Sequence, residues 1–343
     1  MRDRVGTGPP DPAPADVGCH APSHGEDGYA QMMRRHLGTE LMDVLADPET
    51  RELSWNPSDG VVRVDRGMGG RVALDIALDT RRVEMFLNTA AAREGMALGR
   101  ETPSVQASLP QSVFFGARLQ GLVPPITTGP AFVIRKPAAK VYSLDEWISS
   151  GAVPWGIGEQ LGDIAECRQS VLIIGATGSG KTTLANTMLR EIGERFPADR
   201  IVVLEDTPEI RCLSADHLTL RTADGWDLAQ LVKWTLRLSP DRIVIGEVRD
   251  GAALYLMDAW ATGHAGGVAT LHAPDPVSAL HRLDRLAQRE GVPPQPELVA
   301  EAIEWIVTMR RREVVGLARV RGLDAGGRYV VETIDGRREM ACV

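Results

Sequence analysis

The sequence predicts an α/β protein, with a mainly parallel sheet covered by helices and a smaller α+β domain before it. The main observation is that apolar, branched stretches alternate with helix-like stretches after residue 156, as in parallel strands joined by helices. A second observation is a glycine-rich motif at residues 175–182, which lies between such a stretch and a helical pattern. The chain also has 343 residues, which is enough for two domains of ordinary size.

Four segments are expected along the chain. Residues 1–27 are rich in Pro, Gly, Ala and Asp, a composition typical of a disordered tail. Residues 28–137 combine helical and strand patterns and are expected to form the N-terminal α+β domain. Residues 138–155 are predicted to be a linker, and residues 156–343 hold the alternating pattern of the α/β domain.

Elements of the first domain are inferred from the spacing of apolar residues. Met33, Leu37 and Leu41 recur at intervals of four, which indicates one face of a helix. Branched and aromatic residues between turn-forming residues indicate strands. The predicted elements are helices at 29–45 and 81–94, and strands at 53–64, 72–76, 113–122 and 131–134.

Elements of the second domain follow a regular order. Its predicted strands are short, apolar and rich in branched residues, as strands buried inside a parallel sheet are. In such a sheet the ligand pocket lies at the carboxyl ends of the strands. The predicted strands are 171–174, 201–205, 243–245 and 268–271, and the predicted helices are 181–195, 228–237 and 251–262.

Composition limits the classes of function. A net charge of −8 and an aromatic content of 5% argue against a basic, aromatic-lined groove, so direct DNA binding is not expected. The sequence has no apolar run near the roughly 20 residues that span a bilayer. The four cysteines include no C-x-x-C pair, so no zinc module is expected.

The glycine-rich motif has the form G-x-x-x-x-G-K-[ST], which is typical of a phosphate-binding loop. Backbone N–H groups of such a loop and the positive end of the following helix surround the phosphates of a nucleotide. Lys181 is expected to reach the β and γ phosphates, and Thr182 to hold Mg²⁺ through its hydroxyl. The predicted nucleotide-binding residues of the motif are Gly175, Ala176, Thr177, Gly178, Ser179, Gly180, Lys181, Thr182 and Thr183.

Further polar residues follow three other predicted strands: Glu205 with Asp206, Glu247, and His272. Because the carboxyl ends of parallel strands meet at one edge of a sheet, these side chains should lie beside the motif. Gly246 stands where many related ATPases place a metal-binding Asp, so Glu247 is predicted to hold Mg²⁺ through water. Glu205 is then the predicted general base, and the reverse assignment of the two glutamates stays open.

Two histidines lie near these strand ends. His272 could hydrogen-bond the γ-phosphate of a nucleotide and report its loss. His264 lies eight residues earlier and is a second candidate for the site. For each histidine the alternative is a purely structural role.

In combination, these motifs resemble those of secretion ATPases. The phosphate-binding loop, residues 204–206, residues 240–249 and residues 262–272 occur in the order of the Walker A, Asp box, Walker B and His box motifs. The resemblance extends over about residues 30–335 and is greatest to the conjugative-transfer ATPases of TrbB type in type IV secretion. It implies a RecA-like fold for the second domain.

The resemblance implies a motor that hydrolyses ATP with Mg²⁺ and assembles as a homo-hexamer. The motor would lie on the cytoplasmic face of the inner membrane, peripheral to the membrane, with secretion channel and coupling proteins as partners. ATP would bind between the two domains, with Arg118 and Arg135 approaching its phosphates, since an arginine stabilises charge on a transferred phosphate. Arg237 and Arg249 are interface or sensor candidates, whereas Ser239 stands where the family often has another arginine.

Three alternatives to this function are compatible with the sequence. Pilus motors share the same motifs. A DNA-handling RecA-like ATPase would act directly on a strand, which the low aromatic content and the negative charge argue against. A non-hydrolysing scaffold would use ATP only for assembly, which the presence of Lys181, Glu205 and Glu247 argues against.

Overall fold

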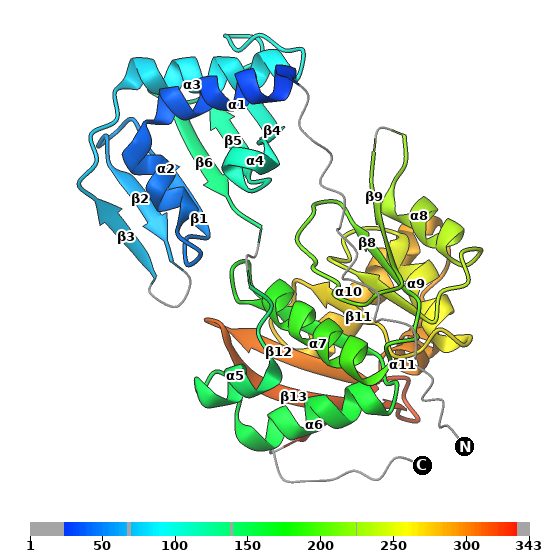
Figure 1. Ribbon diagram of the computed structural model, residues 1–343. Helices are drawn as coiled ribbons and strands as arrows, with labels where there is room; N and C mark the ends of the chain where they lie inside the picture. The colour runs from blue at the N-terminus through cyan, green and yellow to red at the C-terminus, as the bar shows by residue number, and fades with distance from the viewer. Residues whose placement is uncertain (1–23, 67–69, 138–139, 224, 335–343) are drawn as a thin grey trace, which may run out of the picture. The chain divides into compact units, whose positions relative to one another are not determined.

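The computed structural model describes residues 24–66, 70–137, 140–223 and 225–334. The chain divides into two compact units, with the boundary between Lys136 and Pro137, and Figure 1 labels most of their elements. Most of the predicted tail, residues 1–23, lies outside the described residues, and the first helix begins at His24. Among the described residues, no helix is both long and apolar enough to cross a membrane.

The first unit is a six-stranded sheet with helices packed on it. Its elements are α1 (His24–Leu37), α2 (Thr39–Ala46), β1 (Glu52–Trp55), β2 (Val62–Asp65), β3 (Arg71–Leu74), α3 (Thr80–Arg93), β4 (Ser104–Ser108), α4 (Gln111–Phe114), β5 (Arg118–Leu122) and β6 (Ala131–Arg135). The strands pair antiparallel in the order β3-β2-β1-β6-β5-β4. Met33 and Phe86 from the helices pack with Leu119 and Ile134 from the sheet to form an apolar core.

Three predictions for this unit are corrected. The predicted helix 29–45 is two helices, because Gly38 between α1 and α2 has a φ of 86°, which a helix cannot continue through. The predicted strand 53–64 is the hairpin of β1 and β2, and the predicted strand 113–122 begins as the short helix α4 before β5. An apolar pattern does not by itself show where an extended chain turns back.

The second unit is an eight-stranded sheet in the order β14-β13-β12-β7-β11-β10-β8-β9. The six strands from β12 to β9 pair in parallel, and β13 and β14 extend the sheet antiparallel. The elements are α5 (Leu144–Ser149), α6 (Trp155–Glu166), β7 (Val171–Gly175), α7 (Lys181–Arg195), β8 (Ile201–Glu205), β9 (His217–Arg221), α8 (Leu228–Thr235), β10 (Arg242–Ile245), α9 (Ala252–Ala261), β11 (Val268–Leu271), α10 (Pro276–Ala287), the 3-10 helix η2 (Gln288–Glu290), α11 (Pro296–Ala302), β12 (Trp305–Arg310), β13 (Glu313–Leu323) and β14 (Tyr329–Ile334).

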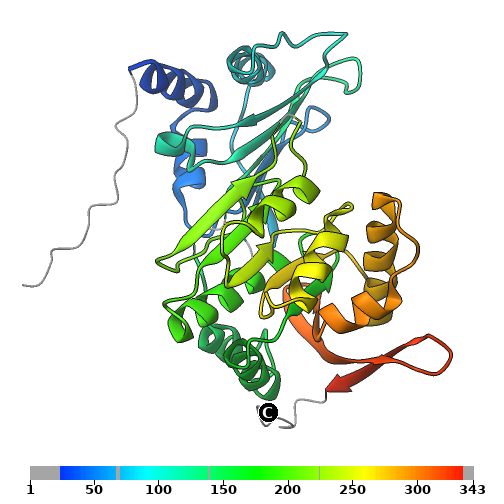
Figure 2. The same cartoon turned by 90° about the vertical axis from the view of Figure 1, so that its right-hand side faces the viewer.

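Helices cover both faces of this sheet. Residues of α8, α9, α10 and α11 form one apolar cluster with the sheet, and residues of α5, α6 and α7 form another on the other face. In Figure 2 the green helices and the yellow-to-orange helices lie on opposite sides of the sheet. The predicted parallel sheet is confirmed, and β7, β11, β10 and β8 are neighbours in it. Their carboxyl ends therefore meet at one edge.

The segment predicted as a linker contains part of this unit's core. Ser143 and Glu146 form a capping box that starts α5, and Leu144 and Trp147 are buried against α7 and its neighbours. The indole Nε1 of Trp147 donates a hydrogen bond of 2.8 Å to Thr187 Oγ1 on α7. Residues 144–149 thus form a packed helix, because Leu144 and Trp147 are buried against the apolar residues of α6 and α7.

Candidate active site

The phosphate-binding loop connects β7 to α7 at the edge where the parallel strands end. Gly175 has a φ of 148°, and a Cβ atom at this position would lie 2.3 Å from the carbonyl oxygen of Met309 on the neighbouring β12. Only glycine fits there. Lys181 begins α7 and is buried, and its Nζ donates hydrogen bonds of 3.1 and 3.0 Å to the carbonyls of Gly175 and Ala176. Thr182 and Thr183 follow in the first turn of the helix.

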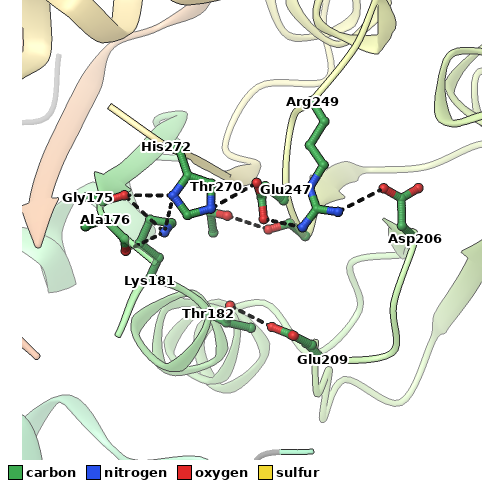
Figure 3. A network of polar contacts seen from close by, with 11 residues as sticks. Gly175, Ala176, Lys181, Thr182, Asp206, Glu209, Glu247, Arg249, Thr270 and His272 are labelled. Carbon is green, nitrogen blue, oxygen red and sulfur yellow. Dashed lines mark hydrogen bonds and ion pairs between the residues drawn. The ribbon is translucent and has the colours of Figure 1, made fainter. Parts of the chain in front are cut away.

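A chain of polar contacts leads from this loop to residues that follow β11 and β10 (Figure 3). Lys181 Nζ lies 3.3 Å from Nδ1 of His272, which follows β11. His272 Nε2 lies 3.1 Å from Oε1 of Glu247, which follows β10, and Glu247 Oε2 accepts a hydrogen bond of 2.8 Å from Arg249. His272 Nδ1 also lies 3.2 Å from the carbonyl oxygen of Gly175, so the imidazole contacts the loop, Lys181 and Glu247 together. The structure therefore brings together three of the predicted catalytic residues.

Glu247 is half-buried within this chain of contacts. Burial raises the pKa of its carboxyl, but the hydrogen bond from Arg249 and the charges of Arg249, His272 and Lys181 outweigh burial and lower the pKa below its ordinary value. Arg249 also lies 3.8 Å from Asp206, so it is an ion-pair partner of two site carboxylates. Glu247 is consequently a carboxylate at neutral pH.

Glu205 lies in a different environment although it ends the adjacent strand β8. It is 2% exposed, and its Oε2 accepts hydrogen bonds of 2.9 and 3.0 Å from the backbone N–H groups of Glu209 and Ile210. Burial raises the pKa of this carboxyl, which the two backbone hydrogen bonds and Arg221 only partly oppose. Its Oε1 has no hydrogen-bond partner among the described residues, and its ion pair with Arg221 is long at 3.7 Å.

Glu209 is a site residue that the sequence analysis missed. Its Oε2 lies 3.2 Å from Oγ1 of Thr182, the predicted Mg²⁺ ligand, as Figure 3 shows. It also lines a pocket with Thr182, Glu205, Glu247 and others. The sequence does contain one indication of this role: Glu209 is a second acidic residue in the segment that follows β8, four positions after Glu205.

The donor atoms in this pocket fit Mg²⁺, which prefers hard oxygen ligands and keeps several of its waters. The Thr182 hydroxyl and three glutamate carboxylates line the pocket, and the buried Glu205 Oε1 lacks a hydrogen-bond partner within the described chain. The described residues contain no group of three or more His, Cys, Asp or Glu that could hold a metal ion by themselves. Phosphate oxygens and water would therefore supply most of the ligands.

Other predicted site residues lie elsewhere. Arg118 on β5 and Arg135 on β6 belong to the first unit, where they are cross-strand partners and line a hollow of about 580 Å³. His264 precedes β11 and so lies at the amino end of the strand that His272 follows, and its buried Nδ1 has no hydrogen-bond partner in the described part of the chain. Arg237 follows α8, where its N–H bonds the carbonyl of Trp234.

The chain is similar to several known proteins. Residues 89–314 match the family model described as Type II/IV secretion system protein. The chain is 39% identical over 305 residues to the probable conjugal transfer protein TrbB of Sinorhizobium fredii, which covers 88% of this chain and 92% of that protein. It is 40% identical over 275 residues to the conjugal transfer protein TrbB of Rhizobium radiobacter, over 80% of this chain and 84% of that protein.

The fold is also similar to a solved structure, that of the ATPase DotB of Legionella pneumophila. The TM-score is 0.54 at 19% sequence identity, over 88% of this chain and 79% of that chain. This likeness concerns the fold, and it confirms the predicted combination of a RecA-like unit with a smaller α+β unit. Together with the order of its motifs and the family match, the similarity to the TrbB proteins shows that the chain belongs to the Type II/IV secretion system protein family, among the conjugal transfer proteins of TrbB type.

Proposed function

We propose that this protein is an Mg²⁺-dependent ATPase that works as a homo-hexameric motor for substrate transfer or pilus assembly in a conjugative type IV secretion system. The names of its relatives support a role in conjugal transfer. The observation that carries the enzymatic part is the contact chain from Lys181 through His272 to Glu247 at the end of the phosphate-binding loop.

Binding of the nucleotide would use the loop and its lysine. The backbone N–H groups of residues 175–182 and the positive end of α7 attract the phosphates. Lys181 would exchange its bonds to two loop carbonyls for bonds to the β and γ phosphates. Because Lys181 also contacts His272, this exchange changes the partners of the imidazole, so His272 can report whether a γ-phosphate is present.

Hydrolysis would place a water in line with the γ-phosphorus. The water oxygen bonds to phosphorus while the bond from phosphorus to the bridging oxygen of ADP breaks. We assign the orientation of this water, and the acceptance of its proton, to Glu247, whose lowered pKa keeps it ionised and whose contact with His272 directs it toward the loop. Glu205 is instead assigned to holding the loop after β8, whose Glu209 and Ile210 N–H groups bond to its Oε2, and burial disfavours the ionised form of its carboxyl.

When bound, Mg²⁺ would supply positive charge that stabilises the charge developing on the phosphates. Thr182 would hold the ion directly, with phosphate oxygens and water as its other ligands. Arg118 and Arg135 are proposed, from the family pattern alone, to stabilise phosphate charge from the first unit. The motor would lie on the cytoplasmic face of the inner membrane, peripheral to it, and act on the secretion channel and coupling proteins.

The experiment that tests this function is steady-state phosphate release by the purified full chain with Mg-ATP, with the mass of the particle measured in the same samples. Wild type should release phosphate in a ring-sized particle. Lys181→Ala should bind nucleotide weakly, whereas Glu247→Gln should bind it normally and turn over at least 10²-fold more slowly, as expected when a group acting on the nucleophile is lost.

The control variant is Lys233→Ala, which removes a half-buried lysine on α8 that pairs with Glu290 and lies over the ring of Tyr255. Because Lys233 does not line the pocket that holds Thr182 and Glu247, this variant should hydrolyse ATP at the wild-type rate. A wild-type rate in Lys181→Ala would contradict the proposal. A ring that binds ATP and never releases phosphate would support the scaffold alternative.

A further inference from the structure

The Thr182 hydroxyl has an acidic partner that comes from a loop and not from the strand β10. Thr182 Oγ1 donates to Glu209 Oε2 at 3.2 Å. A hydroxyl has one proton to donate and two lone pairs. When the proton is fixed by a carboxylate on one side, the lone pairs are directed away from that carboxylate and are available to a metal ion. We propose that Glu209 is a positioning residue that orients Thr182 toward Mg²⁺, an inference that rests on the nucleotide site proposed above.

The loop that carries Glu209 is anchored on both sides. Glu205 Oε2 holds the N–H groups of Glu209 and Ile210 at 2.9 and 3.0 Å. From α7, the buried Asn186 donates to the carbonyl of Glu209 at 3.4 Å and accepts from the N–H of Arg211 at 3.0 Å. Asn186 lies one helical turn after Thr182 in the same helix, so both ends of the Thr182–Glu209 contact are fixed to α7.

Gly246 explains why the acid comes from the loop. Gly246 directly follows β10 and lies beside Glu205 of the adjacent strand β8, since the preceding residues Ile245 and Leu204 are paired. A Cβ atom on Gly246 would lie 3.3 Å from Glu205 Cβ, which is closer than ordinary van der Waals contact. An Asp at this position would therefore crowd the buried Glu205. The glycine leaves this space to Glu205, and Glu205 in turn holds the loop from which Glu209 reaches Thr182.

The test is metal binding by the full chain, measured without turnover. Mn²⁺ serves as the probe, with its electron paramagnetic resonance spectrum recorded in the presence of a non-hydrolysable ATP analogue. Nucleotide affinity is measured in parallel with the metal and in its absence. Because removal of a group that orients a metal ligand typically lowers metal affinity about 10- to 100-fold, Glu209→Ala should weaken Mn²⁺ binding by that factor. Its metal-free nucleotide affinity should match the wild type.

Two further variants separate positioning from folding. Glu209→Gln keeps an acceptor oxygen of the same reach, so its Mn²⁺ affinity should fall between those of wild type and Glu209→Ala. Asn186→Ala keeps the Glu209 side chain but removes the two hydrogen bonds that hold its loop to α7. Like Glu209→Ala, it should weaken Mn²⁺ binding. The matched control is Glu194→Gln at an exposed position of the same helix, which should bind Mn²⁺ as the wild type does.

Wild-type Mn²⁺ affinity and spectrum in both Glu209 variants would overturn the inference. An equal loss of metal-free nucleotide affinity would overturn it too, because Glu209 would then act on the nucleotide and not on the metal. The proposed function fails separately, through an absence of phosphate release in a wild-type protein that still binds Mn²⁺ and nucleotide.

Discussion

Two glutamates at adjacent strand ends have opposite surroundings. Glu205 is enclosed by protein and its pKa is raised by burial, whereas Glu247 is held by Arg249 and its pKa is lowered despite burial. Both follow apolar strands in the sequence, so their neighbours along the chain do not distinguish them. The difference comes from residues that the fold brings near, such as Arg249 for one and the loop N–H groups for the other.

This contrast predicts opposite dependences of stability on pH. The folded state favours the protonated form of Glu205, so its contribution is largest below the ordinary carboxyl pKa of 4.5 and is lost as pH rises through the raised pKa. For Glu247 the folded state favours the ionised form, so its contribution is present above 4.5 and is lost as pH falls through the lowered pKa.

The measurement is Tm as a function of pH for wild type, Glu205→Gln and Glu247→Gln. Relative to wild type, Glu205→Gln should gain stability as pH rises above 4.5 through the raised pKa of Glu205, since the glutamine never ionises. Glu247→Gln should lose stability relative to wild type as pH rises through the range just below 4.5. Parallel curves for the two variants would show that their surroundings do not differ as described.

At the scale of elements, the site depends on four short strands that end at one edge. β7, β11, β10 and β8 carry the phosphate-binding loop, His272, Glu247 and Glu205. The hydroxyl of Thr270 on β11 donates to the carbonyl of Gly246 at 2.6 Å, which ties the ends of β11 and β10 together beside the site. The positions of His272, Glu247 and Glu205 therefore follow from the register of the sheet.

The short helix α5 belongs to the second unit, where it packs against α7. Trp147 is 7% exposed and bonded to Thr187, whereas Trp155 at the start of α6 is 66% exposed. Trp147→Ala should lower the free energy of unfolding by about 3–5 kcal/mol, because it removes a large buried side chain. Trp155→Ala, the matched control, should change it by less than about 0.5 kcal/mol.

Urea unfolding followed by circular dichroism measures both variants. Equal stability of Trp147→Ala and Trp155→Ala would mean that residues 144–149 behave as a linker, as the sequence analysis predicted. A loss confined to Trp147→Ala would assign the segment to the second unit.

At the scale of the whole molecule, the proposed motor requires that ATP hydrolysis in one subunit of the ring depends on the state of its neighbours. Glu247→Gln subunits should bind ATP and enter mixed rings with wild-type subunits. If hydrolysis in one subunit requires movement of its neighbours, phosphate release should fall more steeply than the fraction of wild-type subunits in the mixture. Inactive Lys233→Ala/Glu247→Gln subunits would give the same curve, since Lys233 lies outside the site. A strictly proportional fall would contradict coupling between subunits.

The sequence alone determined the phosphate-binding loop, the parallel sheet and the edge at which Glu205, Glu247 and His272 meet. These features follow from local patterns, because strand ends in a parallel sheet necessarily share an edge. It also identified the family through the order of the motifs.

Only the tertiary structure decided the roles suggested for individual side chains. The Thr182–Glu209 contact joins residues 27 positions apart, and the Lys181–His272 contact joins residues 91 positions apart. The packing of α5 likewise depended on α7, which lies beyond it in the chain. Hydrogen bonds and burial depend on distances in space, which residue types and their spacing along the chain do not specify.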